Sequence, residues 1–98
     1  MKNNEFDSKF PSLSSLLYGE FHDNFDVTDE ESARRVFEFD SRAAPASIPL
    51  MIAELNAALA SIDDIWEAVG RAANRSFTDS GDARQFLEEI LKVWAGGV

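Results

Sequence analysis

The stretch from residue 10 to residue 21, Phe-Pro-Ser-Leu-Ser-Ser-Leu-Leu-Tyr-Gly-Glu-Phe, decides the fold class because its apolar residues repeat at helical spacing. The repeat falls at positions i, i+3, i+4 and i+8, which places one apolar stripe along an α-helix and is carried by Leu13, Leu16, Leu17 and Phe21. Pro11 suits the first helical position, where no backbone N–H is needed. The stretch therefore predicts an amphipathic helix that begins at about Phe10.

The residues that follow predict four more helices. One begins at a capping box formed by Thr28 and Glu31 and runs to about Ala43. The others begin with Ser47 as N-cap, with Ser61, and at about residue 82. No run alternates apolar and polar residues as a half-buried strand does. The predicted fold is all-α, a compact single-domain bundle of about five short helices over residues 10–98, preceded by a flexible N-terminal segment over residues 1–9.

The composition indicates a folded domain with neither a membrane span nor a disulfide. The 98 residues are 45% hydrophobic and include eight Phe and two Trp, which is too apolar for a disordered chain. No stretch approaches the length of apolar sequence that a membrane span requires. The first residues lack the apolar core of a signal peptide, and there is no cysteine. We expect a cytoplasmic protein.

The charge of the chain favours a protein partner over a nucleic acid. Eighteen acidic residues against nine basic residues give a net charge of -9. Nucleic acids are bound mainly by Lys and Arg that neutralise phosphates, so this balance argues against DNA or RNA as the partner. The same charge attracts a basic protein and accelerates its encounter.

Most of that charge lies in one part of the sequence. Residues 10–33 contain no Lys or Arg and six of the eighteen acids, whereas the rest of the chain carries twelve acids and all nine bases, a net of -3. Residues 22–27 of this stretch read as a loop, and aromatic residues stand between its acids, as is typical of interaction hot spots. The predicted partner-binding residues are Tyr18, Glu20, Asp23, Phe25, Asp26, Asp29, Glu30 and Glu31.

The sequence offers no recognisable catalytic or metal-binding constellation. His22 is the only histidine and has neither a cysteine nor a convincing serine partner, so we expect it to be interior and structural. The spacing of Asp23, Asp26 and Asp29 faintly resembles a calcium loop but lacks that loop's alternating ligands and its central glycine. We therefore predict no catalytic residue, no metal and no cofactor.

The opening of the helical region resembles a bacterial immunity family, the contact-dependent growth inhibition immunity proteins (CdiI type). Members of that family typically begin F-P-x-L-x-x-L-x-x-x-F-H-x-D-[WF]. The chain supplies seven residues of this pattern, with one extra residue between Leu16 and Phe21 and with the Asp that follows the histidine displaced by one place: Phe10, Pro11, Leu13, Leu16, Phe21, His22 and Phe25. The resemblance continues more weakly into Glu54-Leu55 and the segment 86–90. The turn over residues 74–81 lacks the aromatic and proline residues of family members, and the link over residues 43–46 is richer in alanine than theirs.

The resemblance implies a stoichiometric inhibitor, and two other classes compete with it. An immunity protein binds the C-terminal toxin domain of a large delivered protein, often a nuclease, as a monomer in a 1:1 complex, and blocks its active or substrate-binding face. The alternative is a helical adaptor or assembly protein without a toxin partner, which self-associates through the helix from Phe86 to Trp94. The periodicity of that helix favours Trp94 as a buried core residue instead. A small enzyme that depends on His22 is the third class.

Overall fold

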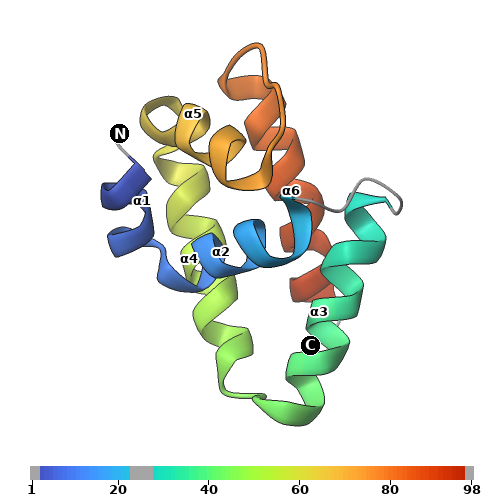
Figure 1. Ribbon diagram of the computed structural model, residues 1–98. Helices are drawn as coiled ribbons and strands as arrows, with labels where there is room; N and C mark the ends of the chain where they lie inside the picture. The colour runs from blue at the N-terminus through green and yellow to red at the C-terminus, as the bar shows by residue number, and fades with distance from the viewer. Residues whose placement is uncertain (1–2, 23–27, 97–98) are drawn as a thin grey trace.

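The structure, a computed structural model, describes residues 3–22 and 28–96. Within these ranges the chain forms six α-helices and one π-helical turn, and no strand (Figure 1). This confirms the predicted all-α class. No helix in the described ranges has the length and apolarity that crossing a membrane requires. The elements are α1 Asn3–Lys9, α2 Pro11–Leu16, η1 Leu17–Phe21, α3 Asp29–Ala43, α4 Ser47–Ala60, α5 Ile62–Ala73 and α6 Ser80–Gly96.

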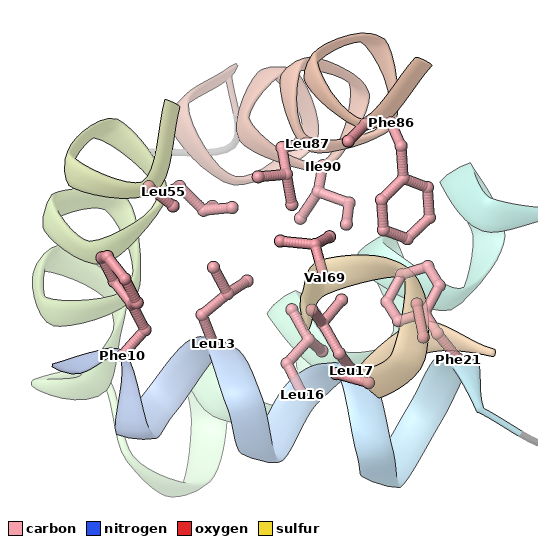
Figure 2. Close-up of a cluster of buried hydrophobic side chains, with 14 of the residues drawn as sticks. Phe10, Leu13, Leu16, Leu17, Phe21, Leu55, Val69, Phe86, Leu87 and Ile90 are labelled. Carbon is pink, nitrogen blue, oxygen red and sulfur yellow. The ribbon is translucent and has the colours of Figure 1, made fainter. Parts of the chain in front are cut away.

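The helix formed by α2 and η1 lies across the bundle with its apolar stripe turned inward. Figure 2 shows side chains of this helix converging with Leu55 of α4, Val69 of α5 and Leu87 of α6. The four residues of the predicted stripe are all at most 4% exposed: Leu13, Leu16, Leu17 and Phe21. Phe21 also meets Phe86 edge to face, with ring centroids 5.4 Å apart. The stretch that predicts the fold class is therefore the stretch that organises the core.

Helix α6 is central to the bundle, since it packs against α3, α4 and α5. Phe86, Leu87 and Ile90 are buried, and Trp94 is fully buried, with its ring edge to face against Phe37 of α3 at 5.4 Å. This confirms Trp94 as a core residue. Because these side chains fill the core, the apolar face of α6 is not available as the self-association surface of the adaptor hypothesis.

Within the N-terminal segment that the sequence predicts to be flexible, residues 3–9 form the helix α1. Phe6 is only 1% exposed and lies 5.4 Å from the ring of Phe10, so it extends the apolar stripe four residues towards the N-terminus. Ser14 Oγ donates a 2.5 Å hydrogen bond to Asp7 Oδ1, which ties α1 to α2. The polar composition of the segment conceals a single buried anchor, Phe6.

The helix starts agree with the sequence in one case and differ in others. Thr28 Oγ1 accepts from the Glu31 N–H at 3.1 Å, which confirms Thr28 as the N-cap of α3. Ser47 is not a cap: it is the first residue of α4, and its Oγ donates to Asp40 Oδ2 at 2.8 Å. Ser61 is the N-cap residue of α5, without a side-chain hydrogen bond. Helix α6 begins two residues earlier than predicted, because Asp79 Oδ1 accepts from the N–H of residue 82.

Candidate functional site

The surface turn η1 departs from regular α-helical geometry at the residues that the sequence singles out. The His22 N–H donates to Leu17 O at 2.9 Å, an i to i+5 bond that defines a π-helical turn. Such turns are rare and occur often at functional sites. η1 carries Tyr18, which is 40% exposed, and Glu20, which is half-buried. The apolar spacing predicts the helix but contains no signal for this change of register.

The end of η1 is fixed by side chains from the turn between α5 and α6. Arg75 Nη1 donates to Phe21 O at 3.0 Å and to Ala73 O at 2.8 Å, so one guanidinium group caps the ends of two helices. Asn74 Nδ2 donates to His22 O at 3.1 Å. These donors satisfy carbonyl groups that a helix end otherwise leaves without partners. The C-terminal end of η1 is therefore held by hydrogen bonds from Asn74 and Arg75.

The cap itself depends on the geometry of the α5 C-terminus. Asn74 adopts a left-handed conformation with φ of 55°, and the Arg75 N–H donates back to Gly70 O at 2.8 Å, as in a Schellman motif. A Cβ on Gly70 would lie 3.0 Å from Arg75 O and 3.3 Å from the ring of Phe77. A glycine suits position 70, because a Cβ there would force these neighbours to shift.

Four of the eight predicted binding residues have described side chains, and these do not share one face. Tyr18 stacks on His22, with ring centroids 6.0 Å apart, whereas Glu20 lines a groove beside α4. Glu30 lies on the opposite flank of α3, where it accepts a 2.7 Å hydrogen bond from Arg34, and Glu31 is exposed. Asp23, Phe25 and Asp26 lie outside the described residues, as does the side chain of Asp29.

Two grooves border α3. The first, which we call the η1 groove, has a volume of about 560 Å³ and runs between α2 and η1, α3 and α4. Its described lining is apolar or small apart from two acids, and comprises Pro11, Ser12, Ser15, Leu16, Gly19, Glu20, Val36, Phe39, Asp40, Ser47 and Met51. Phe39 is 67% exposed, the highest value among the large apolar residues described.

The second groove separates α3 from α6 and has a volume of about 690 Å³. It is chemically mixed, because Glu30, Glu38 and Glu89 line it together with Arg34 and Lys92. The ion pair between Glu30 and Arg34 joins two largely exposed side chains, and pairs of this kind contribute little to stability. The η1 groove is therefore the more uniform of the two surfaces in charge.

The only histidine of the sequence, His22, lies at the C-terminal end of η1. His22 is half-buried, so the expectation of an interior histidine is wrong; its ring stacks on Tyr18, and its backbone carbonyl accepts a hydrogen bond from Asn74. No group of three or more His, Asp or Glu side chains within residues 3–22 and 28–96 is placed to hold a metal ion. The aspartate triplet of the sequence falls partly outside those ranges.

Comparisons of the chain with protein-family models, curated proteins and solved structures gave no significant match. The family resemblance therefore rests on the opening motif. The structure gives these residues a packing role, since Phe10, Leu13, Leu16 and Phe21 are all buried. A motif made of core residues specifies how the first helix packs, and the surface that meets a partner must be argued separately.

Proposed function

We propose that this protein is an immunity protein that binds the C-terminal toxin domain of a contact-dependent growth inhibition system and blocks its active or substrate-binding face. The observation that carries the proposal is the anchored π-helical turn η1, which presents Tyr18 and Glu20 within a stretch, residues 10–33, that has no basic residue. A turn held at both ends loses less conformational entropy when a partner binds. Such a surface suits recognition.

The chemistry of the surface indicates a basic partner. A nuclease holds its substrate through Lys and Arg, so its substrate face has the charge that an acidic protein complements. Oppositely charged surfaces accelerate encounter and help to exclude wrong partners. The partner that we propose is therefore a toxin domain with a basic face, bound by the monomer in a 1:1 complex without cofactor or metal, in the cytoplasm.

The test is binding and protection with the domain encoded immediately upstream of this chain. Reversal of three described acids, Glu20, Glu30 and Glu31, to Lys should weaken binding by about a hundredfold and abolish growth protection. The matched control reverses Asp63, Glu67 and Glu88, which are exposed on α5 and α6, for the same change in net charge. Equal losses in the two triple variants would show that only net charge matters and would remove these three acids from the interface.

A further inference from the structure

Gly19 stands where the folded chain itself gives no reason for a glycine. It lies inside η1, its φ is not positive, and a Cβ built on it would meet no atom within 4 Å. A glycine inside a helix makes the protein less stable than an alanine would. A glycine there is explained when a neighbouring atom lies too close to leave room for a Cβ. Gly70 has such an approach, to Arg75 and Phe77, and Gly19 has none within the described structure.

Gly19 lies in the wall of the η1 groove, and the other walls supply apolar contact. Leu16, Val36 and Met51 line the groove, and Phe39 stands at it with two thirds of its surface exposed. An exposed phenylalanine beside an open groove is a typical anchor for a partner side chain. The volume of about 560 Å³ falls within the range of about 300–1,000 Å³ that is typical of ligand-binding clefts.

The charge of the groove selects its occupant. Its two charged lining residues are Glu20 on η1 and Asp40 on α3, and no Lys or Arg is among the described residues that line it. Arg35 and Arg42 of α3 are exposed and lie outside this lining. A long basic side chain can lay its methylene stem along an apolar wall while its charged end reaches a carboxylate.

We propose that the η1 groove receives a segment of the partner protein in which a Lys or Arg is flanked by apolar side chains, with the partner backbone passing over Gly19. The inference rests on the proposed function, because it names where and how the basic partner docks. A second copy of this chain is a poor occupant, since each copy carries a net charge of -9.

The absent side chain of Gly19 gives the inference a test in which stability and binding move in opposite directions. Gly19→Ala should raise Tm by about 3–5 °C, because alanine favours the helix and finds open space, and should still weaken binding of the upstream-encoded domain by about threefold. Gly19→Leu, which fills the groove with a good helix former, should weaken binding by at least about thirtyfold, and Phe39→Ala by about tenfold. Gln85→Leu adds the same side chain on the exposed face of α6 and should leave affinity unchanged.

A peptide probe separates failure of this inference from failure of the proposed function. A short amphipathic peptide of Leu and Lys, mapped by heteronuclear NMR, should shift the amides of Ser15, Gly19 and Phe39. The shifts should vanish with Gly19→Leu, and a Leu and Glu peptide should produce none. If the upstream domain binds and the Gly19 and Phe39 variants retain full affinity, the groove is not the docking site, although the proposed function stands. If that domain does not bind, the proposed function fails, and the peptide experiment alone tests the groove. Peptide-induced shifts confined to other surfaces would then show that the η1 groove is not a binding site for basic segments.

Discussion

Replacement of Arg75 by methionine should destabilise the fold more than its place in a surface turn suggests. The side chain is half-buried, and its Nη1 donates to Phe21 O and Ala73 O. Methionine keeps a flexible chain of similar reach but removes every donor. Hydrogen bonds from a charged group contribute roughly 1.5–3 kcal/mol each, and water replaces part of that at a half-buried site. We therefore expect a loss of about 2 kcal/mol, which for a domain of this size lowers Tm by about 10 °C.

The assay is thermal unfolding followed by circular dichroism, with Arg84→Met as the matched control. Arg84 is exposed on α6 and loses the same guanidinium group. Hydrogen exchange of the backbone in η1 should accelerate only in the Arg75 variant, because the cap fixes the end of that turn. If the two variants melt within about 2 °C of each other, the Arg75 guanidinium does not stabilise the ends of η1 and α5, and the proposed capping role is wrong.

Three further predictions concern other contacts of the fold. Glu54 accepts hydrogen bonds from the Ser12 and Leu13 N–H groups at 3.3 and 3.0 Å. In chemical denaturation, Glu54→Ala should lower the free energy of unfolding by about 1–2 kcal/mol, whereas the control Glu88→Ala should leave it almost unchanged. Equal losses would mean that the Glu54 carboxylate does not cap α2. Gly70→Ala should destabilise by about 1–3 kcal/mol despite its better helix propensity, because its Cβ meets Arg75 O; a stabilised variant would contradict the reported approach. Hydrogen bonds from the Thr78 hydroxyl and, to a smaller extent, from the Thr78 N–H hold the pKa of Asp82 below its ordinary value. The stabilisation that these bonds give the folded state is present above about pH 4 and is lost as pH falls through the lowered pKa. The Tm of Asp82→Asn should therefore fall less steeply than the Tm of the parent protein as pH drops below about 4. Parallel plots of Tm against pH would show that the ionised Asp82 does not stabilise the fold.

Helical periodicity could be read from the sequence because it reflects burial. The stripe from Leu13 to Phe21 and the buried Trp94 follow directly from it. Helix α1 was missed because its single anchor, Phe6, sits among polar residues and has no second apolar residue in its own helix to establish a period. The prediction of Ser47 as an N-cap is wrong because the residue lies inside α4, where its hydroxyl donates to the Asp40 carboxylate.

The candidate site was less predictable than the fold. A run of acids is visible in sequence, but which helix flank each acid occupies depends on how the helices pack. Glu20 and Glu30 are ten residues apart and line different grooves on either side of α3. The η1 groove itself is assembled from residues of α2, η1, α3 and α4, and the periodicity of any one helix does not show how they meet. The anchoring of η1 by Arg75 joins residues more than fifty positions apart, for which no local signal exists.

The central claim, that this chain neutralises a basic toxin domain by binding it, is tested most directly by one titration. Purified protein is titrated with the C-terminal domain encoded immediately upstream, at low and at high salt, and stoichiometry, affinity and association rate are measured. The account predicts a 1:1 complex whose association rate falls steeply as salt increases, since opposite charges steer the encounter. Absence of binding, or binding with a rate that does not depend on salt, would contradict it.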